Sequence, residues 1–136
     1  MDFTFTEEQV ALRDSINRFL MKEAAPELLR EISETSGGRS RELHAKIAAQ
    51  GITGLSVPEA HGGVGLGDID WTLVTEELGY HAIPDSLVES SYVATALLCS
   101  VPEAGALREQ WLPRVADGTA HISLEHPANP CVADAH

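Results

Sequence analysis

Residues 51–80 read GITGLSVPEAHGGVGLGDIDWTLVTEELGY, and this stretch contains two different kinds of sequence. Its first part carries six glycines and a proline up to position 68, a density that breaks regular structure. Its second part has apolar residues at helical spacing, namely Ile69, Leu73, Val74 and Leu78. The stretch therefore predicts a glycine-rich turn followed by a helix that Asp68 caps and Gly79 ends.

The glycine cluster HGGVGLGD, residues 61–68, invites comparison with a phosphate-binding loop. Such a loop needs a strand before it and a helix N-terminus to receive the phosphate. Here no Lys-Ser or Lys-Thr follows, and a segment interrupted by Pro58 precedes the cluster. We therefore interpret the cluster as a tight turn in which glycines supply positive φ angles.

Three glutamates are candidates for acid/base chemistry. Glu76 and Glu77 are adjacent on the predicted helix, and adjacent helical residues do not face each other, so we interpret them as a solvated acidic face. Glu89 lies in a very apolar segment, where burial would raise its pKa. Helical periodicity instead places Glu89 on a wet edge with Ser86 and Ser90, which we favour.

The N-terminal third of the chain predicts three helices. Thr6 and Gln9 form a capping box, and Phe5 and Val10 are spaced for a hydrophobic staple. The first helix then carries one apolar stripe, made of Leu12, Ile16, Phe19 and Leu20. Pro26 ends this helix or opens a short second one through Ile32. A loop follows at residues 33–38, and a third helix is capped by Ser40, turns Leu43 and Ile47 inward and stops at Gly51.

Two further helices follow residue 85. The segment 86–98 is apolar on most sides, which is typical of a buried helix, and we expect Leu97 in the core together with Leu73. A sixth helix starts near residue 100 and contains Leu107, Trp111 and Leu112. Residues 113–117 form a last turn that Gly118 stops.

The pattern of apolar and polar residues changes after residue 118. Residues 121–125, HISLE, alternate weakly as a strand does, and Pro127 ends the pattern. A lone strand has no partner here, so the chain looks cut just inside a second, β-rich domain. We therefore predict an all-α helical bundle over residues 1–118, followed by the first strand of a truncated β-domain over residues 119–136.

Composition excludes several classes of protein. Nine basic and 21 acidic residues give the 136-residue chain a formal net charge of −12, which repels nucleic acid and anionic membranes. No apolar run approaches the roughly 20 residues of a membrane span, and the acidic N-terminus lacks a signal-peptide pattern. Two cysteines, Cys99 and Cys131, do not form a secreted disulfide framework. We expect free thiols and a cytoplasmic location.

His121, His126, Cys131 and His136 recur every five residues. Zinc binds such side chains, but a spacing of five on a strand turns alternate side chains to opposite faces. We therefore interpret them as surface residues and predict no metal site. The pattern also supports no Ser/His/Asp or Cys/His triad.

Three segments follow one recurring pattern in order and spacing. Residues 1–20, MDFTFTEEQVALRDSINRFL, are similar to F-x-x-T-E-E-Q-x-x-L-R-x-x-x-R-x-F, and residues 110–118, QWLPRVADG, to Y-L-P-x-L-A-x-G. Residues 51–80 match a longer and more specific pattern at Pro58, Glu59, Gly62, Gly63, Gly65, Leu66, Gly67, Asp70, Glu76, Glu77 and Leu78. Together the segments resemble the acyl-CoA dehydrogenase family over nearly the whole chain.

The resemblance implies a helical N-terminal domain, a middle β-domain and a C-terminal helical bundle, of which this chain holds the first. In the family, flavin contacts lie mainly on the other two parts, and the catalytic glutamate lies on the bundle. The resemblance therefore implies no catalytic residue and no FAD binding for this chain alone. The complete enzyme would use FAD to remove hydrogens from Cα and Cβ of an acyl-CoA thioester, in fatty acid or sterol side-chain metabolism.

The family's N-terminal domain walls the acyl pocket through the helix matching residues 86–98. By that match the substrate-binding candidates are Leu87, Ser90, Ser91 and Ala94, which share one helical stripe. Small side chains on a buried helix either leave a cavity or let another helix approach closely. The sequence leaves both alternatives open.

One departure from the family pattern concerns the flavin. The family's first strand ends in T-E-P and a Gly-Ser-Asp turn, whereas this chain has Glu125, His126 and Pro127 and lacks that turn. A carboxylate at the threonine position disfavours the anionic reduced flavin. Some members of the family work as mixed assemblies in which one type of subunit has lost such flavin contacts, and this chain resembles that type of subunit. The alternative function is thus a non-catalytic partner subunit. In either case we expect acyl-CoA as substrate of the complete enzyme and homologous subunits as partners. A third alternative is an independent helical interaction module.

Overall fold

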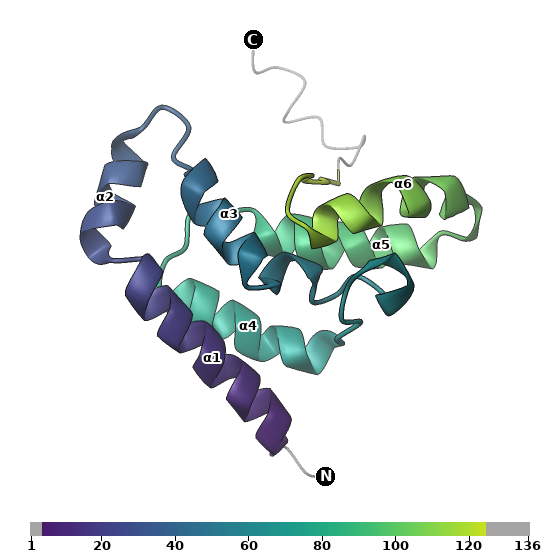
Figure 1. Cartoon of the computed structure of the whole chain (residues 1–136), viewed down its shortest axis with the longest axis horizontal. Coiled ribbons are helices and arrows are strands. Elements are labelled where there is room, and N and C mark those ends of the chain that lie inside the picture. Colours follow the sequence, from purple (N-terminus) through teal and green to yellow (C-terminus); the bar gives the residue numbers. More distant parts are fainter. Residues whose placement is uncertain (1–3, 125–136) are drawn as a thin grey trace, which may run out of the picture.

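The computed structural model describes residues 4–124, and every regular element in that part of the chain is helical (Figure 1). In chain order the elements are α1 (Glu7–Glu23), α2 (Pro26–Glu34), α3 (Arg41–Ala49), η1 (Ile52–Gly54), η2 (Glu59–His61), α4 (Asp68–Tyr80), η3 (Val88–Ala94), α5 (Thr95–Ser100), η4 (Pro102–Ala104) and α6 (Gly105–Ala116). The predicted all-α class is confirmed.

The start of α1 is built as its sequence predicts. Thr6 Oγ1 accepts from the Gln9 amide at 3.2 Å, and Gln9 Oε1 accepts from the Thr6 amide at 3.0 Å. Gln9 Nε2 also donates to Asp70 Oδ1 at 3.0 Å, which ties the first turn of α1 to the first turn of α4. One side chain thus caps its own helix and aligns it with a second helix.

Asp68 does not cap α4, contrary to expectation. The cap is Gly67, whose amide donates to Asp70 Oδ2 at 3.1 Å, and Asp68 is the first helical residue. Asp68 instead accepts from the Tyr92 hydroxyl at 2.7 Å, a bond that raises the pKa of Tyr92. The end of α4 differs too, because the helix continues through Tyr80 and the left-handed residue after it is Ala82 (φ 49°), not Gly79.

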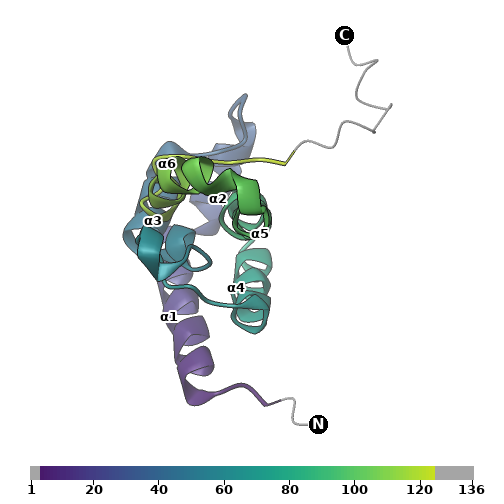
Figure 2. The same cartoon turned by 90° about the vertical axis from the view of Figure 1, so that its right-hand side faces the viewer.

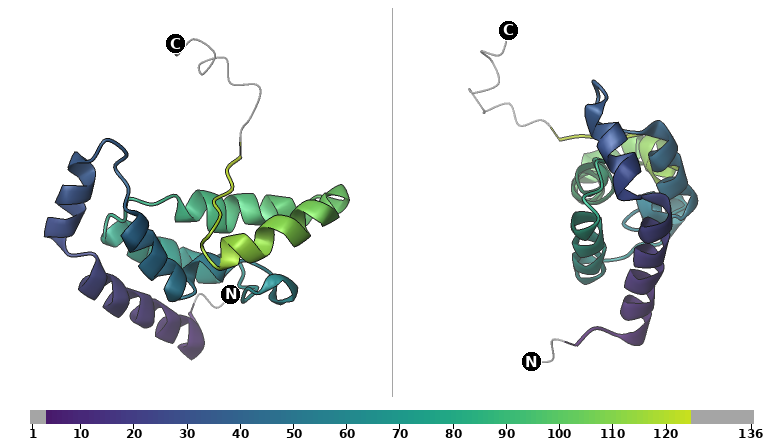
Figure 3. Two further views of the ribbon diagram at one scale, coloured as in Figure 1. Left: turned by 45° about the horizontal axis from the view of Figure 1, so that its top comes forward. Right: turned by 90° about the vertical axis from the view of Figure 1, so that its left-hand side faces the viewer.

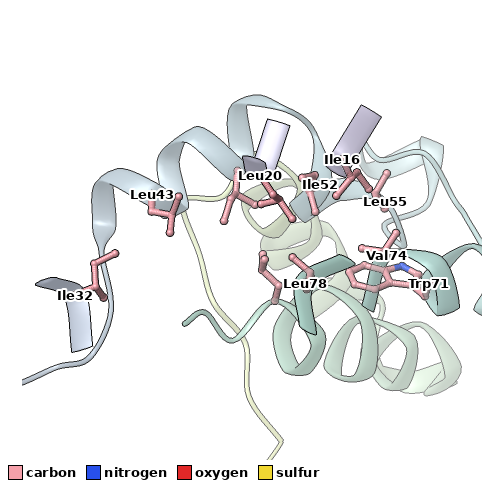
Figure 4. Close-up of a cluster of buried hydrophobic side chains, with 11 residues drawn as sticks. Ile16, Leu20, Ile32, Leu43, Ile52, Leu55, Trp71, Val74 and Leu78 are labelled. Carbon is pink, nitrogen blue, oxygen red and sulfur yellow. The ribbon is translucent and has the colours of Figure 1, made fainter. Parts of the chain in front are cut away.

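The core lies where α1 and α4 pack side by side and meet α3 and the η1 segment (Figures 2 and 3). Figure 4 shows Ile16 and Leu20 of α1 and Ile52 of η1 facing Trp71, Val74 and Leu78 of α4. Trp71 also stacks on Tyr92 with ring centroids 5.1 Å apart, so the core extends to the helix that follows. The buried members of this cluster are Ile16, Leu20, Ile32, Leu43, Ile47, Ile52, Leu55, Trp71, Val74, Leu78 and Leu87.

The glycine-rich segment forms a turn that closes on itself. The amides of residues 63–66 donate to carbonyls of Pro58, Gly54, Val57 and Leu55 in turn, at 2.7–3.2 Å. Gly62 and Gly65 have φ angles of 86° and 72°, as the turn interpretation requires. Because these amides are already bonded within the turn, the segment is not a phosphate cradle.

Residues Leu87 to Ser100 form one continuous helix whose first half, η3, is a π-helix. The Thr95 hydroxyl donates to the Ser90 carbonyl, five residues back, at 2.9 Å and supports this wider turn. The helix is buried on one side only. Leu97 is 41% exposed, so its predicted place in the core is wrong, whereas Leu73 is buried as expected.

Other expectations are corrected in detail. Ile69 is 63% exposed and Leu107 is 50% exposed, so neither belongs to the inward face of its helix. Pro113 lies inside α6 rather than opening a separate turn, and Gly118 ends that helix in the left-handed region (φ 76°) as predicted. Residues 121–124 are not in a strand, since no partner strand lies among residues 4–124. Within that range, no helix is both long and apolar enough to cross a membrane.

Gly63 is the position where the turn tolerates no side chain. A Cβ there would lie 2.0 Å from the carbonyl oxygen of Val57, whereas a Cβ at Gly79 meets nothing within 4 Å. We therefore expect Gly63→Ala to lower the free energy of unfolding by more than about 2 kcal/mol. The matched change Gly79→Ala should leave it unchanged or raise it by up to about 1 kcal/mol. Equal denaturant midpoints for the two variants would contradict this account of the turn.

Candidate functional site

The four residues predicted to bind substrate all lie on the buried side of the η3–α5 helix. Leu87, Ser90, Ser91 and Ala94 are between 1% and 7% exposed. Their surroundings differ, however. Leu87 belongs to the main core and edges a hollow of about 260 Å³ beside Leu78 and Ile83. Ser90 Oγ accepts from the amide of Ile122 at 2.9 Å and so fixes the segment that leaves the helical domain.

Ala94 is the predicted pocket residue that borders an open apolar space. This groove, of about 410 Å³, runs between α5 and α6 and is closed on one side by residues 122–124. Leu97, Val101 and Leu107 along it are each more than two-fifths exposed. The lining residues are Ala94, Leu97, Leu98, Val101, Leu107, Trp111, Ile122, Ser123 and Leu124. An open apolar surface of this kind suits a ligand tail or another protein segment.

A cluster that the sequence analysis missed joins His44, Asp85 and His121. His44 Nδ1 lies 2.9 Å from Asp85 Oδ2, and His44 Nε2 lies 3.1 Å from the Gly118 carbonyl oxygen. The rings of His44 and His121 have centroids 4.2 Å apart. The sequence pattern around His121 relates it only to nearby residues. His44 and Asp85 are 41 positions apart, and no local pattern pairs residues at that separation.

This cluster borders a broad hollow of about 880 Å³ at the junction of α3 with the segment after α6. Desolvation lowers the pKa of His121, and the nearby His44 adds to this effect, so the neutral imidazole of His121 is favoured. The other members of the five-residue pattern are His126, Cys131 and His136, and they lie outside the described residues.

Cys99 is a free thiol, and burial raises its pKa.

A second polar cluster lies between α1 and α4. Asn17 Nδ2 donates to Glu77 Oε2 at 2.6 Å, and His81 Nε2 lies 3.9 Å from the same oxygen. Glu77 is 9% exposed, so its predicted place on a solvated face is wrong, while Glu76 is exposed as expected. Glu89 is exposed as expected, but Ser90, predicted to lie on the same wet edge, is only 2% exposed, so that part of the prediction is wrong. The Asn17–Glu77 bond of this cluster joins α1 to α4.

Residues 6–119 match the family described as acyl-CoA dehydrogenase, N-terminal domain. The chain belongs to the acyl-CoA dehydrogenase family. Its helical fold is thus that of the family's N-terminal domain, as the sequence resemblance implied.

Relatives and solved structures agree with this assignment. The chain is 31% identical over 120 residues to (2S)-methylsuccinyl-CoA dehydrogenase of Cereibacter sphaeroides, covering 82% of the chain and 20% of that relative. It is 32% identical over 130 residues to acyl-CoA dehydrogenase IpdE2 of Mycolicibacterium smegmatis, covering 95% of the chain and 41% of that relative. The structure of the ChsE4-ChsE5 complex from Mycobacterium tuberculosis matches with a TM-score of 0.79 at 28% identity, covering 90% of this chain and 34% of that one.

The chain spans between a fifth and about two-fifths of the length of these two curated relatives. Complete acyl-CoA dehydrogenases are flavoprotein oxidoreductases that carry FAD. What this domain contributes to such an enzyme depends on its own residues.

The Glu77 cluster generates a stability prediction. Replacing Glu77 with Ala removes the acceptor of the Asn17 amide in a buried setting, so we expect a loss of about 1–3 kcal/mol in the free energy of unfolding. Glu77→Gln, which keeps an acceptor oxygen, should lose less. The neighbouring change Glu76→Ala should stay within about 0.5 kcal/mol. Urea titrations of the three variants would check this order, and an equal loss at both glutamates would reject it.

Proposed function

We propose that this chain is the N-terminal domain of an FAD-dependent acyl-CoA dehydrogenase and forms part of the wall of the acyl pocket. The reaction of the complete enzyme would be α,β-dehydrogenation of an acyl-CoA thioester, and the chain alone would be inactive. The observation that carries the proposal is the open apolar groove beside Ala94, on the helix that corresponds to the family's pocket helix. A cytoplasmic location is part of the proposal.

The glycine turn does not fit the pyrophosphate of a flavin dinucleotide. A pyrophosphate needs several free backbone donors, and the amides of the glycine turn are bonded to carbonyls of the turn itself. The segment with Glu125 and His126, which replaces the family's flavin-contacting motif, lies outside the described residues. We therefore assign FAD to other parts of the complete enzyme or assembly, and derive no reaction step from this chain.

Within the proposal, the η3–α5 helix shapes space rather than performing chemistry. Leu87, Ser90, Ser91 and Ala94 remain the proposed pocket-lining residues, and Ala94 has the clearest access to open space. The Ser90 hydroxyl holds the backbone of Ile122. This bond would set where residues 119–136, the proposed start of the middle β-domain, leave the helical domain of residues 1–118.

A second candidate function is a non-catalytic partner subunit in a heteromeric acyl-CoA dehydrogenase. The observation that favours it is the match to a solved complex whose name contains two components, ChsE4 and ChsE5. Glu125 and His126, in place of the family's threonine and glutamate, support it as well. In that case homologous subunits would supply the flavin and the catalytic base.

The two candidates differ in where the flavin resides. The complete protein, purified alone, should show stoichiometric flavin absorbance if it is the catalytic subunit. If it is a partner subunit, flavin should appear only after co-expression with a homologous subunit. Absence of flavin and of acyl-CoA oxidation in both preparations would reject both candidates.

For the 136-residue chain itself we expect no FAD binding and no acyl-CoA oxidation with any electron acceptor. The physical reason is that the one glycine-rich candidate for a pyrophosphate site has the amides of residues 63–66 already bonded within its own turn. Absorbance of the purified chain after incubation with FAD and desalting would measure binding. A stoichiometric chromophore, or activity that survives further purification, would contradict this prediction.

Ala94→Phe tests the pocket directly. In the complete enzyme or assembly the phenyl ring would fill part of the groove, so longer acyl-CoA substrates should lose at least about tenfold in affinity while short ones still bind. Ala96→Phe is the matched control, because Ala96 is exposed on the same helix and outside the groove. Unchanged affinity across chain lengths, with the fold intact, would remove this helix from the pocket.

A further inference from the structure

Three metal-ligating side chains from distant parts of the sequence meet at one place. His44 comes from α3, Asp85 from the loop between α4 and η3, and His121 from the segment after α6. One potential ligand atom from each residue lies within 4.8 Å of the others. Two imidazole nitrogens and a carboxylate oxygen form a ligand set that zinc accepts in proteins.

The hydrogen bonds of His44 define what its ring can hold. Nε2 faces the Gly118 carbonyl oxygen at 3.1 Å, and a carbonyl only accepts, so this nitrogen carries the hydrogen. Nδ1 of the neutral ring then has a bare lone pair aimed at a carboxylate oxygen of Asp85, 2.9 Å away. Two lone pairs at this distance need a cation between them, either a proton or a metal ion. Metal-bound histidines in proteins commonly donate their other N–H to a backbone carbonyl in this way.

Asp85 supplies an independent observation. Its side chain is only 8% exposed, and Oδ1 is buried without a hydrogen-bond partner among residues 4–124. A buried carboxylate oxygen without a partner is costly, and a bound cation would remove that cost. Asp85, His44 and His121 all border the 880 Å³ hollow, from which an ion could enter.

We propose that His44 Nδ1, the carboxylate of Asp85 and a ring nitrogen of His121 bind one divalent transition-metal ion of the zinc class. The fourth ligand position faces the hollow and would hold water or an external ligand. Tetrahedral ligands at roughly 2.0–2.1 Å from the ion lie about 3.3 Å apart. His44 Nδ1 and Asp85 Oδ2 therefore need to separate by a few tenths of an ångström, and the His121 nitrogen, now within 4.8 Å of the other ligand atoms, has to move closer to them.

The charges around the hollow include some that oppose a cation. Arg39 and Arg41 line it and are positive, while Asp117 lines it and is negative. Arg39 is held by a bond to Ser86 Oγ at 3.2 Å. The ion would connect α3, the loop before η3 and the exit segment, so its effect is to fix how the chain leaves this domain.

The test uses the whole 136-residue chain, stripped with a chelator and titrated with Co²⁺ and Zn²⁺. We expect one Co²⁺ per chain with the visible d–d absorption of a tetrahedral site, and its displacement by Zn²⁺. His44→Gln and Asp85→Asn should each weaken binding by at least about tenfold. His61→Gln is the control, because His61 belongs to η2 and not to the cluster.

Two further variants keep the outcome decisive. His121→Ala removes an exposed ligand and should weaken binding even if a change at His44 or Asp85 prevents folding, as judged by circular dichroism. The triple variant His126→Gln, Cys131→Ser, His136→Gln should bind like the wild type. The proposal is overturned if the wild type binds neither ion, since a proton then occupies the gap. It is equally overturned if only the triple variant loses binding.

Discussion

The burial of Trp71 is the interaction on which the rest of the structure depends. Its ring is 1% exposed and lies among side chains from α1, η1 and α4, with Tyr92 stacked against it. Burying an aromatic ring of this size contributes about 4 kcal/mol. Its indole N–H has no hydrogen-bond partner among the described residues, which costs about 1–3 kcal/mol. Burial outweighs that cost, and the ring therefore sets where α1 and the η3–α5 helix sit.

Polar contacts around this core decide alignment more than stability. Gln9 bonds Asp70 at one end of the α1–α4 pair, and Asn17 bonds the buried Glu77 further along. Hydrogen bonds are directional, so two of them spaced along a helix pair select one register out of several that apolar packing alone would allow. The Tyr92 hydroxyl on Asp68 extends the same alignment to the η3 turn. The η3–α5 helix thus reaches its position through a chain of contacts that begins at α1.

The candidate sites depend on this arrangement in different ways. The sequence left open whether the small side chain of Ala94 borders a cavity or lets another helix approach, and the structure places Ala94 at the edge of an open apolar groove. The four stripe residues nevertheless face different surroundings, because the π-helical turn rotates successive side chains by less than an α-helix does. The His44, Asp85 and His121 cluster had no local signal, because its members meet only when α3 and the exit segment pack together.

The sequence by itself determined the local features: the capping box of Thr6 and Gln9, the glycine turn of residues 54–66, and the all-α class. Each of these is decided within a short stretch of the chain, so a local pattern contains most of the interaction. Only the tertiary structure decided that Glu77 is buried, that Leu97 is exposed, and that His44 faces Asp85. Burial depends on which neighbour covers a helix face, and that neighbour comes from a distant part of the chain that no local periodicity identifies.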